Sequence, residues 1–364
     1  MKFRCERDVL LDALTTAGRA VSSRGGSLPV LSGLLVELTG DNLRVTGSDL
    51  DLTISVERVV NGERDGVAVL PAKLASDIVR SFKAGAVHLE VDGDQAQVSV
   101  DRSNFSLRIM PADEYPRFER PQGEAITIES DKLSIALKQV VPAASSDDSR
   151  PILTGVLMAA EADGVRFVAT DSYRLAVRDI GGAAVLSEGQ HVLVPSRALN
   201  ELTRTLHSGK EVSLMLGQRD ASFSVGGVQL STRLIEGEFP NYRGLIPKNH
   251  PNKLTVERET FLDALRRVRL MAQEATPVRV AMRSDGLELI AITQDIGQAH
   301  EDLDAEYDGQ ELTVAFNPQY LLDGVEVCGG EKITLETVDA LKPAVLRSSG
   351  DAEFLYLLMP VRVS

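Results

Sequence analysis

The stretch VLVPSRALNELTRTL, residues 192–206, sets the pattern of the whole chain. A short β-branched run enters a turn at Pro195, and apolar residues then recur at helical spacing, which predicts a strand followed by a short amphipathic helix. The same design returns as VLPAKLASDIVRSF at 69–82 and as VAFNPQYLLDGVEV at 314–327. The copies begin roughly 120 residues apart, which is the length of a domain rather than of a solenoid repeat. The sequence therefore predicts three tandem domains of one fold.

A second block also recurs three times, in the same order relative to the first. It reads ERDVLLDAL at 6–14, SDKLSIAL at 130–137 and ERETFLDAL at 257–265. Each copy has an acidic residue in its first turn and apolar residues at helical spacing, which suits the helix dipole and gives one buried face. Two blocks kept in order three times indicate a true repeat. Each domain should therefore contain two helices.

Alternating, strand-like segments fill the rest of each repeat. In the first repeat, the turn pairs Gly40-Asp41 and Asp92-Gly93 predict antiparallel hairpins among strands expected at 31–38, 43–60, 87–100 and 105–111. Connectors rich in proline and polar residues follow at 110–125 and 236–253. We therefore expect an α+β fold with domains at 1–119, 120–246 and 247–364.

Composition places the chain among soluble globular proteins. Its 364 residues are 43% hydrophobic, and no apolar run approaches the ~18 residues of a membrane span. The opening MKFRCERD lacks the apolar region of a signal peptide, so we expect a cytoplasmic protein with no membrane partner. Cys5 and Cys328 stand in separate repeats in apolar contexts, which favours buried free thiols over a disulfide or a metal site.

Charge gives a mixed signal about nucleic acid. The net charge of −14 argues against a polyanionic partner on average, but the placement of basic residues matters more than the sum. Lys73 and Arg80 lie two helical turns apart in the first repeat, and Arg197 and Arg204 occupy the same positions in the second. The third repeat has Gln319 and Glu326 there, while its first helix carries Arg266, Arg267 and Arg269, with Lys138 aligned to Arg266. Recurrence in register favours a phosphate-facing surface over a merely solvated helix face.

The residues that usually carry catalysis are scattered. The five histidines fall in no metal-binding or nucleophile motif, and no glycine-rich loop precedes a helix. Asp171 and Ser172 could belong to a nucleophilic site, but turn chemistry at a strand end is the favoured interpretation. We therefore expect no catalytic residue, no cofactor and no metal; an enzyme with a site assembled between domains is a remote alternative.

Two further stretches stand out, ATDSYRLAV at 169–177 and LYLLMPVRV at 355–363. The second ends on apolar residues where a terminus is usually polar and frayed. It could be a final core strand, or an apolar groove in which methionine supplies adaptable contact to a partner. The residues alone leave both interpretations open.

Taken together, several motifs resemble one family over essentially the whole chain. The opening MKF, LPVLSGLLVEL, ATDSYRLA, EFPNYRGLIP, FNPQYLLD and the terminal YLLMPVRV stand in the order and spacing of the bacterial sliding clamps, the β subunits of DNA polymerase III. The resemblance implies three tandem DNA-clamp domains, with antiparallel sheets outside and two helices per domain inside. It also implies a head-to-tail homodimeric ring around double-stranded DNA, which is contacted without regard to sequence.

The resemblance assigns residues to three surfaces. The DNA-facing set is Arg24, Lys73, Arg80, Lys138, Arg197, Arg204 and Arg266. The subunit joint would set Phe105 and Leu107 against Leu270 and Met271 of the other chain, with Arg102 and Glu301 at the rim. The partner pocket corresponds to Leu153, Thr170, Ser172, Tyr173, Arg174, Leu175, Pro240, Gly244, Leu245, Pro343, Leu357, Met359, Pro360, Val361 and Arg362.

The implied partners bind this pocket through short linear motifs that end in leucine and phenylalanine-like side chains. They are the replicative polymerase catalytic subunit, the clamp loader, translesion polymerases, and mismatch repair and ligase-type proteins. This chain departs from many members of the family at Ser172-Tyr173, where Gly-His is common, at Gly244, where arginine is common, and at Pro151-Ile152, where a DNA-contacting loop often carries aromatic residues. A monomeric triple-repeat protein-binding scaffold is the alternative to a clamp.

Overall fold

The protein is described from a computed structural model that covers residues 1–21, 28–118, 125–182, 186–187, 189–207, 209–272 and 276–362. The chain forms two compact units, each described here by itself. Unit 1 comprises 1–131 and 200–234, and unit 2 comprises 132–199 and 235–364. The three-domain division expected from the repeats stays a prediction, because the strands of the middle repeat are shared between the two units and the first boundary lies outside the described residues.

Unit 1 contains two antiparallel sheets. The five-stranded sheet has the order β5 (Asn61–Arg64), β1 (Lys2–Glu6), β7 (Ala86–Asp92), β8 (Gln95–Val100) and β9 (Ser103–Arg108). The eight-stranded sheet has the order β10 (Ile126–Glu129), β15 (Glu211–Leu216), β16 (Asp220–Val225), β17 (Val228–Arg233), β4 (Leu52–Val59), β3 (Asn42–Ser48), β2 (Gly33–Thr39) and β6 (Gly66–Pro71). Strands of the first and second repeats thus join edge to edge where β4 pairs with β17.

Unit 2 is built in the same way. Its nine-stranded sheet has the order β14 (His191–Pro195), β11 (Gly155–Glu161), β12 (Gly164–Thr170), β13 (Arg174–Gly181), β26 (Asp351–Leu358), β25 (Ala344–Ser348), β24 (Lys332–Thr337), β18 (Asn252–Glu257) and β22 (Ala305–Asp308). Its four-stranded sheet has the order β21 (Gly297–Leu303), β20 (Gly286–Thr293), β19 (Val278–Arg283) and β23 (Leu312–Phe316). Here the second and third repeats join where β13 pairs with β26.

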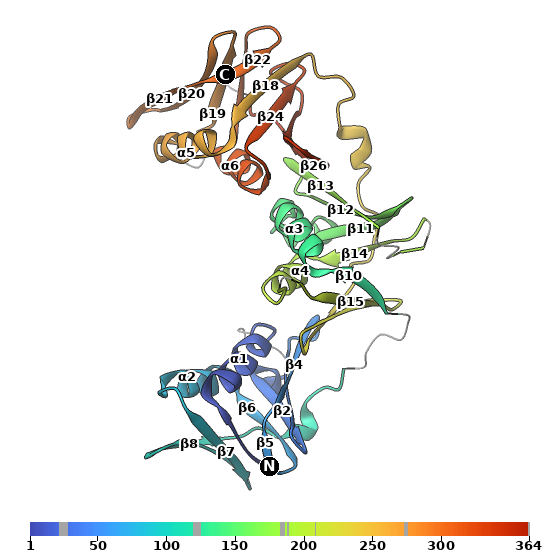
Figure 1. Cartoon of the computed structure of the whole chain (residues 1–364), viewed down its shortest axis with the longest axis vertical. Helices are drawn as coiled ribbons and strands as arrows, with labels where there is room; N and C mark the ends of the chain where they lie inside the picture. Colours follow the sequence, from blue (N-terminus) through green and yellow to red (C-terminus); the bar gives the residue numbers. More distant parts are fainter. Residues whose placement is uncertain are drawn as a thin grey trace. The chain divides into compact units, whose positions relative to one another are not determined.

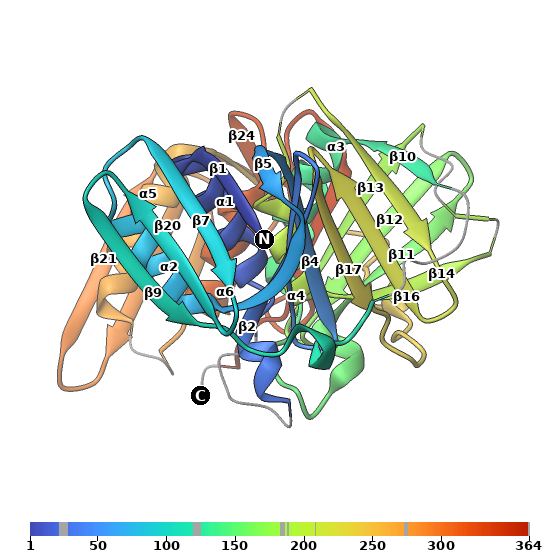
Figure 2. The same cartoon turned by 90° about the horizontal axis from the view of Figure 1, so that it is seen from below.

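Six α-helices in the described part of the chain confirm the two helical blocks of each repeat. They are α1 (Arg7–Gly18), α2 (Ala72–Ser81), α3 (Ser130–Val140), α4 (Ser196–Thr203), α5 (Arg258–Val268) and α6 (Pro318–Val327). In unit 1, α1 and α2 pack side by side behind β7, β1 and β9 (Figures 1 and 2). In unit 2, α5 and α6 form the equivalent pair (Figure 1). Short 3-10 turns complete the chain at Pro29–Ser32, Ala112–Glu114, Val141–Ala143, Pro151–Thr154, Tyr242–Leu245 and Arg269–Met271.

Alternation along the strands explains why sheets and helices pack together. On β2, the side chains of Leu34, Val36 and Leu38 are buried, whereas those of Leu35 and Glu37 on the opposite face are only partly buried. The inner face therefore excludes water, which is the main driving force of folding, and the outer face is free to vary. The predicted hairpin turns are present, with Gly40 and Gly93 in the left-handed conformation at φ of 56° and 59°.

Two smaller expectations can be compared with the structure. Cys5 and Cys328 are both free and buried, as predicted, and burial raises the pKa of each thiol to about 12. Both therefore remain protonated and poorly nucleophilic at neutral pH. Among the described residues, no helix is long and apolar enough to cross a membrane.

Candidate functional site

An apolar patch lies at the β13–β26 junction of unit 2, on the face of the sheet opposite helix α6, which we call the outer face. Leu175 faces Leu357 across the two strands, and Val177 faces Leu355. These four side chains are at most 8% exposed and belong to one buried cluster. Isoleucine and aromatic residues of the connector that follows β17 pack against it, namely Ile235, Phe239, Tyr242 and Ile246. The connector thus seals most of the patch from water.

We call this buried cluster the apolar floor of unit 2. Three large apolar side chains beside it remain exposed. Tyr173 is 58% exposed, Leu245 50% and Met359 40%. The backbone N–H of Met359 donates a hydrogen bond to the carbonyl oxygen of Tyr173 (2.9 Å), so the segment after β26 is fixed beside the turn before β13. Apolar groups exposed around an apolar floor are the usual composition of a peptide-binding surface.

The turn that presents Tyr173 is an Asx turn. The Oδ1 of Asp171 accepts hydrogen bonds from the backbone N–H groups of Tyr173 (2.9 Å) and Arg174 (3.0 Å). Ser172 lies at φ of 82°, a left-handed conformation that strains residues other than glycine. Its hydroxyl accepts a hydrogen bond from Arg150 (3.3 Å). These contacts confirm the turn chemistry expected at this strand end.

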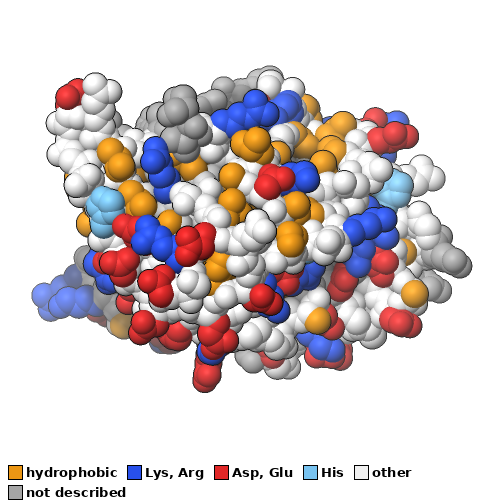
Figure 3. All heavy atoms as spheres, turned by 90° about the horizontal axis from the view of Figure 1, so that it is seen from above, with side chains coloured by type: hydrophobic (Ala, Val, Ile, Leu, Met, Phe, Trp, Pro, Cys, Tyr) orange, Lys and Arg blue, Asp and Glu red, His pale blue; other side chains and the backbone are white. Residues whose placement is uncertain are grey.

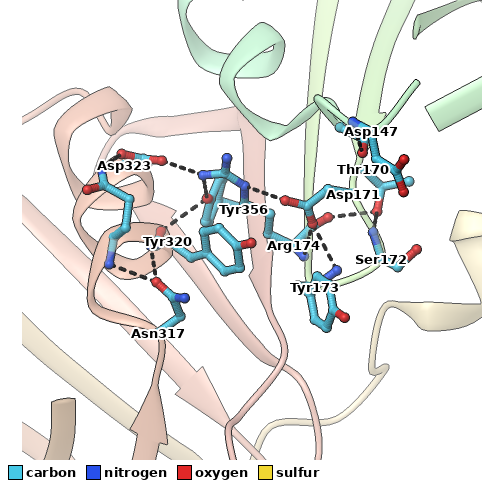
Figure 4. Close-up of polar contacts among 12 residues, drawn as sticks. Asp147, Thr170, Asp171, Ser172, Tyr173, Arg174, Asn317, Tyr320, Asp323 and Tyr356 are labelled. Atoms are coloured by element: carbon cyan, nitrogen blue, oxygen red, sulfur yellow. Dashed lines mark hydrogen bonds and ion pairs between the residues drawn. The ribbon is translucent and has the colours of Figure 1, made fainter. Parts of the chain in front are cut away.

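Arg174 joins this turn to helix α6 (Figure 4). Its guanidinium donates to Asp171 (3.0 Å), to Asp323 and to the Tyr356 hydroxyl (3.3 Å). The guanidinium carbon also lies 4.4 Å from the ring centre of Tyr320, within range of a cation–π interaction. The Arg174 side chain is only 10% exposed, so its charge is satisfied almost entirely by the protein.

Two pKa shifts follow from this network. Burial alone lowers the pKa of Arg174, but its contacts with the Tyr356 hydroxyl and the Asp323 carboxylate outweigh burial and raise that pKa. Burial also raises the pKa of Tyr356, although the nearby guanidinium opposes the increase. Arg174 is therefore a permanent cation and Tyr356 a neutral hydrogen-bonding group at neutral pH.

Gly324 makes room for the network on α6. A Cβ added to this glycine would lie 2.5 Å from the ring of Tyr356. The helix can therefore approach β26 closely enough for Asp323 to contact Arg174. The N-terminus of α6 is fixed by Asn317, whose side chain accepts hydrogen bonds from the N–H groups of Gln319 (2.9 Å) and Tyr320 (3.2 Å).

A groove of 630 Å³ lies next to the last described residues. Val361 and Arg362 line it together with Leu341, which is 65% exposed, and with Arg279. The backbone N–H of Val361 donates to the carbonyl oxygen of Ala315 (2.8 Å), which fixes the segment at this groove. The core-strand interpretation of LYLLMPVRV is confirmed up to Leu358, where β26 ends. Met359, Val361 and Arg362 beyond it are exposed, Val363 lies outside the described residues, and a partner groove stays a prediction.

The predicted pocket residues therefore fall into distinct environments, all within unit 2. The buried ones are Leu153, Thr170, Leu175 and Leu357; the partly buried ones are Arg174, Pro343 and Pro360; and the exposed ones are Ser172, Tyr173, Pro240, Gly244, Leu245, Met359, Val361 and Arg362. The sequence-based prediction missed Tyr320, whose ring stacks on that of Tyr173 with centres 6.3 Å apart, and Asp323. Their spacing of three residues on one face of α6, inside the quoted FNPQYLLD motif, is the signal that could have found them.

The predicted DNA-facing side chains are exposed wherever they are described. Arg80 pairs with Asp77 (2.8 Å), Arg204 lies just beyond α4 and near Glu201 (3.5 Å), and Arg266 pairs with Glu326 of α6 (2.9 Å). Acidic and basic side chains are likewise interspersed on the face drawn in Figure 3. The remaining members of the set are Lys73, Lys138 and Arg197, while Arg24 lies outside the described residues.

The residues predicted for the subunit joint differ in accessibility. Phe105 on the edge strand β9 is 40% exposed, and Leu270 is 84% exposed. Leu107, by contrast, is 3% exposed and is a core residue of its own sheet, and Met271 is half-buried. Of the two rim residues, Arg102 is exposed, whereas Glu301 already forms a two-point ion pair with Arg267 of its own chain at 2.5 and 3.1 Å.

Two histidine side chains of unit 2 lie beside glutamates. His300 lies 2.8 Å from Glu288, which also pairs with Arg283. His250 lies 3.4 Å from Glu336, which also pairs with Arg347. Within the ranges that the structure describes, no group of three or more histidine, cysteine, aspartate or glutamate residues could hold a metal ion.

Comparison with known proteins identifies the family. Family models of the DNA polymerase III beta subunit match the N-terminal domain at 1–119, the central domain at 127–241 and the C-terminal domain at 243–362. The chain is similar to the beta sliding clamps of Streptomyces coelicolor (35% identical) and Bacillus subtilis (30%), with full coverage of both chains in each case. It also resembles the crystal structure of the Bacillus subtilis sliding clamp, with a TM-score of 0.93, 30% identity and full coverage of both chains.

A second similar structure is that of the sliding clamp of Pseudomonas aeruginosa bound to griselimycin, with a TM-score of 0.92, 28% identity and full coverage of both chains. Similarity in sequence and in fold thus extends over the entire chain. The expected α+β clamp fold is confirmed. The chain belongs to the bacterial DNA polymerase III β subunits, the non-enzymatic sliding clamps that act in DNA replication.

Proposed function

We infer that two copies of this chain close into a ring around duplex DNA, and that unit 2 holds short peptides of the replication and repair proteins that work on that DNA. The observation that carries the peptide site is the group of exposed apolar side chains, Tyr173, Leu245 and Met359, beside the buried cluster that contains Leu175 and Leu357. The ring would act in the cytoplasm, where bacterial DNA is replicated.

Edge strands support the closure of a ring. Strand β9 ends the five-stranded sheet of unit 1, and β21 ends the four-stranded sheet of unit 2. An unpaired edge beside an exposed phenylalanine or leucine is a surface that folded proteins normally cover. Head-to-tail pairing would cover Phe105 of one chain and Leu270 of the other. The two joints of a closed dimer would then leave no such edge uncovered.

Loose contacts with phosphate suit a sliding function. In such a ring, the phosphate backbone would be contacted without reading base sequence by the exposed side chains of Lys73, Arg80, Lys138, Arg197, Arg204 and Arg266. Such contacts weaken as salt rises, with a slope of about −0.9 in log affinity per phosphate neutralised. Retention on DNA would therefore depend on topology rather than on affinity.

Peptide binding at unit 2 should be modest in strength. Burying two apolar anchors gives roughly 3–6 kcal/mol, whereas micromolar binding needs about 8 kcal/mol. Backbone hydrogen bonds must supply the difference. Weak binding allows polymerase, clamp loader, translesion polymerase, mismatch repair protein and ligase to exchange on one surface. The Ser172-Tyr173 pair gives this pocket an aromatic wall through the stacking of Tyr173 on Tyr320.

Retention on DNA of different topology tests the ring. The protein is loaded with its clamp loader and ATP onto nicked circular plasmid, half of the sample is linearised, and both halves are followed by gel filtration at moderate salt. Release from the linear form alone is the expected result. Equal release from both forms would favour the monomeric scaffold, as would a monomer in sedimentation equilibrium at micromolar concentration.

A further inference from the structure

A second groove, of 450 Å³, lies on the outer face of the eight-stranded sheet in unit 1. It runs between the sheet and the connector after β9, where Pro116, Arg117 and Phe118 form one wall. Its floor includes Ser55 of β4 and Gln229 of β17, which face each other across the junction of the two strands. The groove therefore occupies a junction between repeats, as the apolar patch of unit 2 does.

The strand registers show that the two junctions are equivalent. In unit 1, Thr46 pairs with Ser55, which pairs with Gln229. In unit 2, the corresponding row is Val168, Val177 and Leu355. A second row has Thr53 with Ser231 in unit 1 and Leu175 with Leu357 in unit 2. Every floor position compared here is polar in unit 1 and apolar in unit 2.

The connectors above the two floors also correspond. The sequence EYPRF at 114–118 in unit 1 matches EFPNY at 238–242 in unit 2. Tyr115 and Phe118 meet edge to face with ring centres 6.5 Å apart, and Phe239 and Tyr242 do so at 6.3 Å. Unit 1 therefore has the architecture of the peptide site proposed for unit 2, with a hydroxyl and amide floor.

The polar groups of this floor retain hydrogen-bonding capacity. Thr46 and Ser55 share one hydrogen bond between their hydroxyls (2.9 Å), yet each hydroxyl can donate once and accept twice. Gln229 donates through its amide nitrogen to Ser222 (3.0 Å), and the side-chain carbonyl can accept two further bonds. Ser231 also donates to Ser222 (3.0 Å). A ligand here would meet both donors and acceptors.

The charges of the groove are close to balance. Arg44 is paired with Glu57 at 3.0 and 2.6 Å, as Arg166 is with Asp179 in unit 2. This leaves Arg117 and Glu37 as the other charged lining residues. A polyanion such as nucleic acid would meet these carboxylates, so the electrostatics favour a ligand without net charge.

We propose that this groove binds an extended, uncharged polar peptide of a partner protein, rich in serine, threonine, asparagine or glutamine. The choice of a peptide rests on the function proposed for unit 2, because the two junctions share strand order, connector and aromatic pair. The polar class rests on the floor of unit 1 alone. Phe118 would cover the backbone of such a peptide while Ser55 and Gln229 bind its amide side chains.

Peptide display on the full-length protein tests this proposal. Three libraries of dodecapeptides are used, one restricted to serine, threonine, asparagine, glutamine and glycine, one apolar and one acidic, with unit 2 blocked by excess of a peptide ending in Leu-Phe. The matched variant is Ser55→Val with Gln229→Leu, which installs the residues found at the equivalent positions of unit 2. Thermal unfolding checks that the variant is folded.

The polar library should yield binders whose affinity falls about tenfold or more in the variant, since two hydrogen-bonding groups are lost. No enrichment from the polar library, or equal binding to the variant, would overturn the proposal. Binding of a neutral oligosaccharide such as maltohexaose in place of peptides would also overturn it. Failure of the labelled Leu-Phe peptide to bind the unblocked protein would instead reject the function proposed for unit 2, so the two failures are distinguishable.

Discussion

The two repeat junctions have the same backbone and opposite side-chain chemistry. On the outer face, Thr53 and Ser231 in unit 1 stand where Leu175 and Leu357 stand in unit 2. At the preceding residue of the strand, whose side chain lies on the opposite face, the relation reverses, because the buried Leu52 in unit 1 corresponds to Arg174 in unit 2. The strand partners of these two residues, Thr232 and Leu358, do not reverse.

This inversion separates what folds the repeat from what gives each copy a role. Both junctions have an ion pair across adjacent strands, between arginine and glutamate in unit 1 and between arginine and aspartate in unit 2. Both also have an Asx turn before the junction strand. In unit 1, Asp49 accepts hydrogen bonds there from the backbone N–H groups of Asp51 (3.1 Å) and Leu52 (2.9 Å). These shared features are local and depend on backbone geometry. The side chains on the outer face do not set the backbone geometry, so they can be polar at one junction and apolar at the other.

The largest effect should come from the buried ion network of unit 2. Replacing Arg174 with methionine leaves Asp171 and Asp323 without their cation and should lower the free energy of unfolding by about 3–5 kcal/mol. Leu52→Met at the equivalent position of unit 1 conserves volume and should cost less than about 1.5 kcal/mol. Urea unfolding measures the free energy of unfolding of each variant. Amide hydrogen exchange, followed separately in β13 and in β4, shows which junction has lost stability. Equal losses would show that the two junctions do not differ in this way.

Exchanging the floor residues should give the next largest effect. Leu357→Ser places a hydroxyl among buried apolar side chains and should cost about 2–4 kcal/mol, besides weakening the binding of a Leu-Phe peptide. The reciprocal Ser231→Leu is at a half-buried position and should change stability by less than about 1 kcal/mol. Thermal unfolding and fluorescence polarisation measure the two quantities. A large loss from Ser231→Leu would mean that the hydroxyl floor is structural.

Alkaline pH should affect both junctions alike. Burial raises the pKa of Tyr115 in unit 1 and of Tyr356 in unit 2, and each hydroxyl donates to a backbone carbonyl, of Thr46 and Tyr320 respectively. The unfolded chain loses these phenolic protons near pH 10 whereas the folded chain keeps them. The contribution of these tyrosines to stability should therefore be constant below about pH 10 and fall above it by up to ~1.4 kcal/mol per pH unit per tyrosine. The buried thiols of Cys5 and Cys328, whose pKa values are also raised, add a loss that begins near pH 9. Equilibrium unfolding from pH 8 to 11 measures the slope, which each Tyr→Phe variant should reduce.

The smallest effect should come from the strained turns. Leu50 and Ser172 are equivalent residues of the two Asx turns, at φ of 83° and 82°. Leu50→Gly and Ser172→Gly should each raise the free energy of unfolding by about 0.5–1 kcal/mol, because glycine adopts this conformation without strain. Ser172→Ala keeps the Cβ and serves as the control. If alanine stabilised as much as glycine, strain would not be the cause.

The sequence predicted those parts of the fold that depend on local periodicity. Helices α1 to α6 and the hairpins at Gly40 and Gly93 follow from residues close in the chain. The repeat junctions could not be predicted in this way, because the pairing of β13 with β26 depends on register between distant segments. The Arg174–Asp323 contact joins residues 149 positions apart. Helical spacing relates Asp323 to Tyr320 on one face of α6, but it does not indicate Arg174 as a partner.

The candidate site was predicted in the same partial way. Family resemblance located Tyr173, Leu175 and Met359, which the structure places in one unit around the apolar floor. It did not show that Leu107 is buried by its own sheet, because alternation along β9 is too irregular to fix which face is covered. Burial of a single side chain depends on packing in three dimensions.

The ion pairs of the basic helices have a consequence for motion along DNA. Arg80, Arg204 and Arg266 each have a carboxylate within 2.8, 3.5 and 2.9 Å. A guanidinium that leaves a carboxylate to meet a phosphate exchanges one ion pair for another, so little energy separates one position on the duplex from the next. In the ring proposed above, the free energy of the complex would therefore change little as the ring moves along the duplex. The diffusion coefficient along the duplex would then be set by the drag of water rather than by the breaking of contacts.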